Sequence, residues 1–111
     1  MSAKFEIRMN KAGQYSFNLL AINGKVILTS GLFQVKTDLA RYIESVKKFA
    51  EHDNKYQRRA SGNNGYYFVL KAANGHIIVT SKIYSSIAGM EKGIASVKAN
   101  ASAAVIRDWT I

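Results

Sequence analysis

The chain has 111 residues, the length of one ordinary domain, and contains no cysteine, which excludes disulfides and cysteine-based zinc sites. Sixteen lysines and arginines against seven aspartates and glutamates give a net charge of +9, and such a field attracts polyanions such as nucleic acid or an acidic protein. No apolar run approaches the ~18–20 residues that span a bilayer, and the first residues leave no room for a signal peptide. We therefore expect one cytoplasmic domain over residues 1–111 that does not bind membranes.

The first elements predicted along the chain are three strands. In residues 4–9 apolar and charged side chains alternate, and a turn follows at residues 10–13. Asn23-Gly24 lies between two alternating segments, which is the pattern of a hairpin with a type I′ turn. Pairing outward from that turn leaves Ile27 on the opposite face and gathers these residues on one apolar face: Tyr15, Phe17, Leu19, Ala21, Val26 and Leu28.

A helix is predicted next, over residues 36–50. Its apolar positions Leu39, Ile43, Val46 and Ala50 follow the spacing of a single helical stripe. The stripe is suited to cover the apolar face of the hairpin. We expect Thr37 to cap the N-terminus of this helix with its hydroxyl.

The same series of elements then occurs a second time. Residues 15–50 lie over residues 66–101 when the chain is shifted by 51 positions, and 14 of the 36 aligned pairs are identical. The second copy predicts a strand at 55–60, a hairpin around Asn74-Gly75, a helix at 87–101 capped by Ser86, and a last strand at 105–110. Internal repeats of this kind determine the architecture, and we place them at residues 4–54 and 55–111.

These elements predict an α+β domain built from two tandem β-β-β-α-β repeats. The two apolar hairpin faces and the two helical stripes predict one antiparallel sheet with both helices packed on one face. The opposite sheet face carries a mixture of polar and apolar residues, which is typical of a solvated face.

The second copy closely resembles the YegP family of small bacterial proteins. The resemblance is carried by Asn-Gly-x-Ile-Ile-x-Thr-Ser, by Tyr84, and by the segment Gly93-Ile-Ala-Ser-Val-Lys-Ala-Asn100, and it extends over residues 4–101. It implies tandem β(3)-α-β units with exchanged C-terminal strands, and a pseudo-twofold monomer. The first copy departs from the family pattern at residues 38–42, where the family has a small-residue helix start and Glu-x-Gly. The resemblance implies no activity, since members of the family are uncharacterised.

The sequence offers little for catalysis. His52 and His76 are isolated, the seven carboxylates are scattered, and the glycines at 61–65 precede a strand, whereas phosphate-binding loops precede a helix. The Thr-Ser pairs at 29–30 and 80–81 are interpreted as hydroxyls that bond the backbone at strand ends. We expect a protein without enzymatic activity, cofactor or metal.

The face opposite the helices is the candidate site. Alternation brings basic and aromatic residues together there: Lys4, Arg8, Lys55, Arg59, Tyr67 and Lys71. Three interpretations are open, namely a solvated face without a ligand, a nucleic-acid interface that combines phosphate contacts with base stacking, and a surface for protein docking or self-association. Trp109 is expected to pack as part of the last strand.

Overall fold

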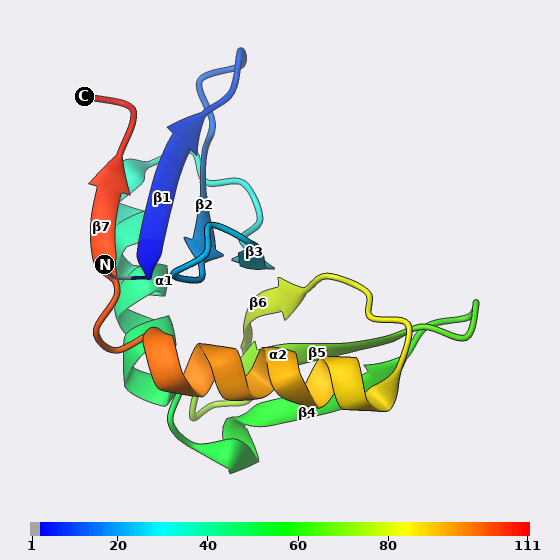
Figure 1. Cartoon of the computed structure of the whole chain (residues 1–111). Coiled ribbons are helices and arrows are strands. Elements are labelled where there is room, and N and C mark those ends of the chain that lie inside the picture. The colour runs from blue at the N-terminus through cyan, green and yellow to red at the C-terminus, as the bar shows by residue number, and fades with distance from the viewer. Residues whose placement is uncertain (1–2) are drawn as a thin grey trace.

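The structure is a computed structural model that describes residues 3–111. Seven strands, two α-helices and one short 3₁₀ helix follow one another as two copies of one unit (Figure 1). The elements are β1 (Lys4–Met9), β2 (Tyr15–Leu20), β3 (Val26–Thr29), α1 (Lys36–Phe49), η1 (Asp53–Lys55), β4 (Tyr56–Ala60), β5 (Tyr66–Lys71), β6 (Ile77–Ser81), α2 (Ile87–Asn100) and β7 (Val105–Asp108). The predicted α+β fold with tandem repeats is confirmed.

All seven strands form one sheet in the order β4-β5-β6-β3-β2-β1-β7. The two repeats meet where β3 pairs with β6, through Leu28 with Ser81 and Thr29 with Thr80. The strand after each helix joins the other repeat, because β7 pairs with β1 and β4 pairs with β5. The predicted antiparallel sheet is confirmed for the other pairings, and one pairing departs from it, since β7 runs parallel to β1 (Figure 1).

Both helices form where the apolar stripes predict them. Ser86 caps α2, and its side chain accepts a hydrogen bond from the Gly89 amide at 3.0 Å. The expected cap by Thr37 is wrong, because α1 begins at Lys36 and its N-cap residue is Val35, which has no capping side chain. Val35 occupies the position that Ser86 has in the second repeat. Each helix has 14 residues, and neither of them is long and apolar enough to cross a membrane.

The two hairpin turns differ from the predicted type. Gly24 and Gly75 have φ near +84°, whereas neither Asn23 nor Asn74 has a positive φ, so a type I′ turn is excluded. Each turn instead has a three-residue loop, with Ala21 N–H bonded to the Lys25 carbonyl at 2.8 Å in the first repeat. That loop shifts the register by one residue near the turn.

A β-bulge then restores the predicted register. Leu19 lies opposite Leu28, but Leu20 lies opposite Val26, so Ile27 is the additional residue of the bulge. As a result Ile27 is buried and Val26 is 39% exposed, the reverse of the alternation that an unbroken strand predicts. The second repeat has the same irregularity after Leu70.

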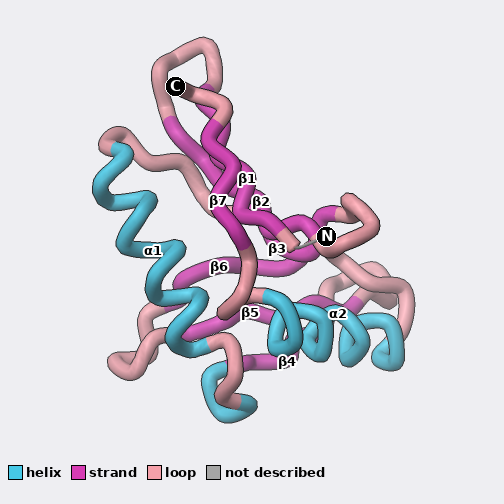
Figure 2. Tube along the Cα trace, turned by 60° about the vertical axis from the view of Figure 1, so that its left-hand side comes forward, coloured by secondary structure: helices cyan, strands magenta, loops and turns pink. Residues whose placement is uncertain are grey.

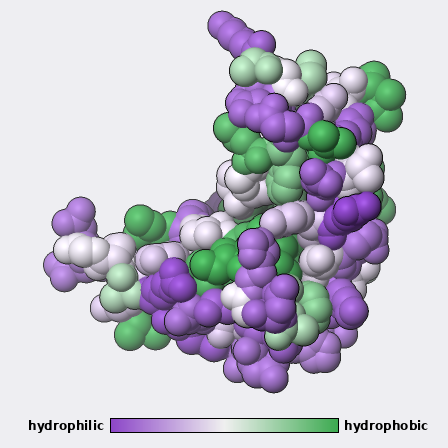
Figure 3. Space-filling model, turned by 180° about the vertical axis from the view of Figure 1, so that it is seen from behind, coloured by the Kyte–Doolittle hydropathy of each residue, from purple (hydrophilic) through white to green (hydrophobic). Residues whose placement is uncertain are grey.

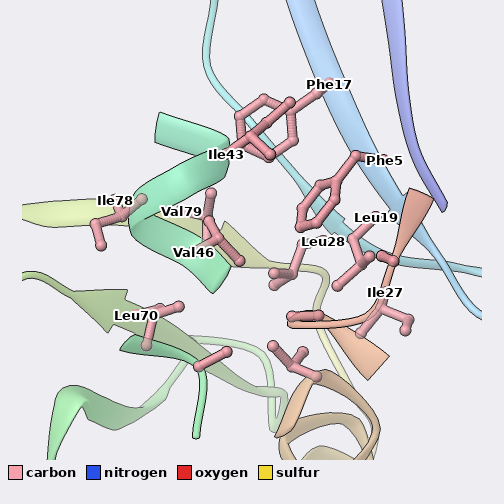
Figure 4. Close-up of a cluster of buried hydrophobic side chains, with 14 of the residues drawn as sticks. Phe5, Phe17, Leu19, Ile27, Leu28, Ile43, Val46, Leu70, Ile78 and Val79 are labelled. Carbon is pink, nitrogen blue, oxygen red and sulfur yellow. The ribbon is translucent and has the colours of Figure 1, made fainter. Parts of the chain in front are cut away.

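The core lies between one face of the sheet and the two helices. Figure 4 shows side chains from α1 and from strands of both repeats turned toward one another. Phe5, Phe17 and Phe68 are among the largest fully buried side chains. Figure 2 shows that α1 and α2 lie at a steep angle and meet the sheet at different places. One continuous core therefore ties the repeats together, and the opposite sheet face remains free of helices.

Candidate nucleic-acid interface

Side chains of β1 and β7 form a basic and aromatic cluster on the open face of the sheet. Because Glu6 lies beside Arg107 in the parallel register, alternation brings Arg8 and Trp109 to the same face one step further along. We call the cluster of Glu6, Arg8, Arg107 and Trp109 the β1–β7 patch.

Trp109 is the centre of the β1–β7 patch. Its amide donates to the Ile7 carbonyl at 3.0 Å, which continues the pairing of β7 with β1. Its indole Nε1 donates to Glu6 Oε2 at 2.9 Å. The guanidinium carbons of Arg8 and Arg107 lie 5.2 Å and 4.5 Å from the indole centroid. With both guanidiniums near its ring, Trp109 as a residue is still 50% exposed.

The electrostatics of the patch are positive. The hydrogen bond from the Trp109 indole, and then the one from Arg8, hold the pKa of Glu6 below its usual range. Glu6 is therefore ionised at neutral pH and supplies one negative charge. Arg8, Arg107 and neighbouring Lys4 supply three positive charges, which leaves a net charge of about +2 around an exposed aromatic ring.

The other predicted residues lie at the far end of the sheet. Arg59 lies opposite Tyr67, and its guanidinium donates to Gln57 Oε1 at 2.7 Å. Lys71 is at the end of β5, where the bulge places it opposite Ile77. Tyr67 is half-buried, whereas Trp109 is exposed.

The structure thus divides the predicted site into two parts. Lys4 and Arg8 belong to the β1 end of the open face, and Arg59, Tyr67 and Lys71 to the β4–β5 end. The expectation for Lys55 is wrong, because it belongs to η1, and its ammonium lies 5.9 Å from the Phe49 ring centroid at the end of α1.

The predicted packing role of Trp109 is wrong as well. β7 is an edge strand whose residues are mostly exposed, and Trp109, which follows it, is 50% exposed. The sequence does contain a usable signal, since Arg107 and Trp109 are two positions apart and share one face of a strand. Only the parallel pairing with β1 brings them to Arg8.

A hollow of about 460 Å³ lies beside the junction of the two repeats and is lined by residues 29–33, Tyr42 and residues 77–80. Figure 3 shows hydrophobic surface in the inner corner of the L-shaped outline. The Tyr42 hydroxyl lies 2.9 Å from His76 Nε2. The polar side chains of the lining are the hydroxyls of Thr29, Ser30, Tyr42 and Thr80. Within residues 3–111, no three histidine or carboxylate side chains are grouped to hold a metal ion.

The Thr-Ser segments carry out the backbone role that was predicted for them. Ser30 Oγ accepts from the Phe17 amide at 2.9 Å and donates to the Gly31 carbonyl. Ser81 Oγ accepts from the Phe68 amide at 3.0 Å and donates to the Lys82 carbonyl. Both hydroxyls are thus bonded within the structure.

Comparison with known proteins finds one family over both repeats. The family described as "Domain of unknown function (DUF1508)" matches residues 10–57 and 61–108. A UPF0339 protein of Acinetobacter baylyi is 44% identical over 110 residues, covering 99% of each chain. The UPF0339 protein YegP of Escherichia coli K12 is 39% identical over 110 residues, covering 99% of this chain and all of the relative.

Solved structures show the same fold. The solution NMR structure of yegP from E. coli, described as a protein of unknown function, superposes with a TM-score of 0.91 at 38% identity, covering 98% of this chain and 94% of that one. The solution NMR structure of a UPF0339 protein from Shewanella oneidensis also gives a TM-score of 0.91, at 41% identity, covering 97% and 92% of the two chains.

Proposed function

The chain belongs to the uncharacterised YegP family of DUF1508 proteins, and we propose that it is a cytoplasmic, non-enzymatic protein that binds single-stranded nucleic acid through the β1–β7 patch. The observation that carries this proposal is the half-exposed indole of Trp109 with two guanidinium groups beside it on an open sheet face.

The first argument is stacking. Nucleic-acid bases stack on aromatic side chains and on guanidinium planes, and each such contact is worth ~1–3 kcal/mol. In the β1–β7 patch both kinds of group occur side by side. The indole is oriented in advance by its hydrogen bond to Glu6, so little side-chain entropy is lost when a base binds.

The second argument is charge. Arg8 and Arg107 lie beside the ring and are suited to contact the phosphates next to a stacked base, and Lys4 lies further along β1, where it pairs with Val105. The remaining positive charge is distributed over both repeats, which favours association with a polyanion from many directions.

The shape of the site favours a single strand over a duplex. Stacking on Trp109 requires an unpaired base whose face is accessible, as in the sheet-based RNA-binding domains. The helices lie on the other side of the sheet, and the open face presents none of them to a major groove (Figure 2).

The test is binding of a labelled, mixed-sequence 12-nucleotide RNA, its DNA equivalent and a 12-base-pair duplex, followed by fluorescence anisotropy at several salt concentrations. We expect Trp109→Ala to weaken single-strand binding about tenfold or more. Arg107→Gln should weaken it less and lower the salt slope by about one.

The matched control is Lys92→Gln, which removes one charge from the exposed side of α2. It should change affinity much less than Arg107→Gln. Equal effects of these two variants, or preferential binding of the duplex, would show that only net charge attracts nucleic acid. Loss of all binding at moderate salt would have the same meaning and would direct the search to acidic protein partners.

A further inference from the structure

We propose that the free edge of β4 binds an acidic, extended segment of a partner protein, which adds to the sheet as a strand parallel to β4. This goes beyond the proposed nucleic-acid site, which lies at the opposite end of the sheet. The inference starts from the symmetry of the two repeats. A shift of 51 residues superposes β1 on β4, with Phe5 matching Tyr56 and Arg8 matching Arg59.

The edge of β1 provides an example of a strand added in this way. It is covered by β7, which pairs with it in parallel from Lys4 with Val105 to Ile7 with Asp108. Val105 N–H donates to the Ala3 carbonyl at 3.1 Å, and Trp109 N–H donates to the Ile7 carbonyl at 3.0 Å. In the described residues β4 pairs with β5 alone, because the chain passes from α1 through η1 directly into β4 and leaves no segment to cover it.

The backbone of β4 is ready for the same pairing. Ser61 N–H bonds to the Gly65 carbonyl, so alternation directs the backbone groups of Gln57 and Arg59 toward β5. The N–H and C=O of Arg58 then point outward. The Arg58 carbonyl corresponds to that of Ile7, the acceptor for Trp109.

Charge selects an acidic occupant. In the first repeat Arg8 forms an ion pair with Glu6 at 3.1 Å. In the second repeat Gln57 takes the place of Glu6, so the Arg59 guanidinium bonds to a neutral amide. Arg58 is already neutralised by Glu91 at 2.6 Å and Asp53 at 3.0 Å. A carboxylate on the added strand, opposite Gln57, would supply the negative charge that Arg59 lacks.

The probe is a capped peptide with the sequence of residues 103–111 in which Glu replaces Arg107, the position that faces Glu6 within the chain. The matched control peptide carries Lys at that position. NMR titration of the labelled full chain should show amide shifts along β4 with the Glu peptide. The Lys peptide should bind about tenfold more weakly, because it places a cation beside Arg59.

A spin label at the peptide N-terminus tests the orientation. Parallel addition predicts line broadening near residues 54–56, whereas antiparallel addition would broaden signals near residue 60. Ala60→Pro removes an outward N–H without breaking the bonds to β5, and it should weaken binding. Met9→Pro is the equivalent change on β1, two residues beyond the last pair with β7, and it should leave peptide binding at β4 unchanged.

Several results would overturn the proposal. One is the absence of β4 shifts at millimolar peptide, and another is equal binding of the Glu and Lys peptides to the unmodified chain. Both are independent of whether the proline variants fold. A concentration-dependent dimer in sedimentation that Ala60→Pro abolishes would identify a second copy of the chain as the occupant in place of an acidic partner.

Discussion

Thr29 pairs with Thr80 where β3 meets β6, and these two residues occupy equivalent positions in the two repeats, 51 residues apart. Two equivalent residues that pair with each other in an antiparallel ladder lie on either side of a twofold axis. The axis therefore passes between these two threonines. The chain therefore resembles a symmetric dimer whose two subunits are fused. A substitution in one repeat can be compared with the same substitution at the equivalent position of the other repeat.

The serines after these threonines give the first prediction. Ser81→Ala leaves the amide of buried Phe68 without its acceptor, which should cost ~1–2 kcal/mol of unfolding free energy. Ser30→Ala removes the equivalent bond to Phe17 at a half-buried position, where water can replace the hydroxyl, so it should cost less. Urea unfolding of both variants checks the order, and a larger loss for Ser30→Ala would contradict it.

The second prediction concerns Gly93, which packs against the Tyr84 ring. A Cβ at this position would overlap the phenol hydroxyl and the adjacent ring carbon. Gly93→Ala should therefore destabilise the chain by ~1–3 kcal/mol, although alanine ordinarily favours a helix over glycine. Thermal unfolding measures the effect, and Tyr84→Phe should recover part of the loss. An unchanged or raised melting temperature would show that Tyr84 moves aside without cost.

The third prediction is a pH dependence from Asp108. The hydrogen bond from Lys36 at 2.8 Å, and then those from Thr110, lower the pKa of Asp108 to about 2. The folded state therefore binds this proton less readily than the unfolded chain, whose aspartate titrates near 3.9. The resulting stability is complete above about pH 4 and is lost as the pH falls toward 2.

Asp108→Asn isolates this contribution. The variant should be less stable than the unmodified chain by about 1 kcal/mol at neutral pH, because the ion pair is partly exposed. The difference should vanish near pH 2. Urea unfolding at pH 7, 4 and 2 tests both statements, and a difference that stays constant with pH would assign the effect to something other than the charge.

The fourth prediction separates the roles of β7 and Trp109. Deletion of residues 105–111 uncovers the edge of β1 and removes the ion pair of Lys36 with Asp108, so it should lower the melting temperature by several degrees. Trp109→Ala alone should cost less than ~1 kcal/mol, since it loses exposed contacts. If Trp109→Ala destabilises the chain as much as the deletion does, the indole is a packing residue after all.

Much of the fold was predictable because it depends on periodicity. The repeat, the two hairpins and both helices follow from the spacing of side chains along the sequence, and the structure confirms them. Burial of Ile27 and Ile78 was not predictable from alternation, because a three-residue turn and a compensating bulge shift the register only locally.

The candidate site was less predictable because it depends on pairing between distant segments. Nothing near Trp109 in sequence shows that β7 lies parallel to β1, and this pairing alone brings the indole to Arg8 and Glu6. The prediction for Lys55 is wrong for a local reason. The predicted strand 55–60 includes Lys55, but Lys55 is the last residue of η1 and β4 begins one residue later, at Tyr56.

Trp109 is the chain's single tryptophan, so its intrinsic fluorescence reports on the β1–β7 patch directly. The decisive measurement is its emission during titration with unlabelled single-stranded RNA at moderate salt. If a base stacks on the indole, single-stranded RNA should quench the emission saturably, and the quenching should persist at moderate salt. A separate titration with duplex RNA of the same charge should quench the emission much less. Emission that stays unchanged while RNA binding is detected by another method would show that the nucleic acid binds elsewhere, and would contradict the proposed site.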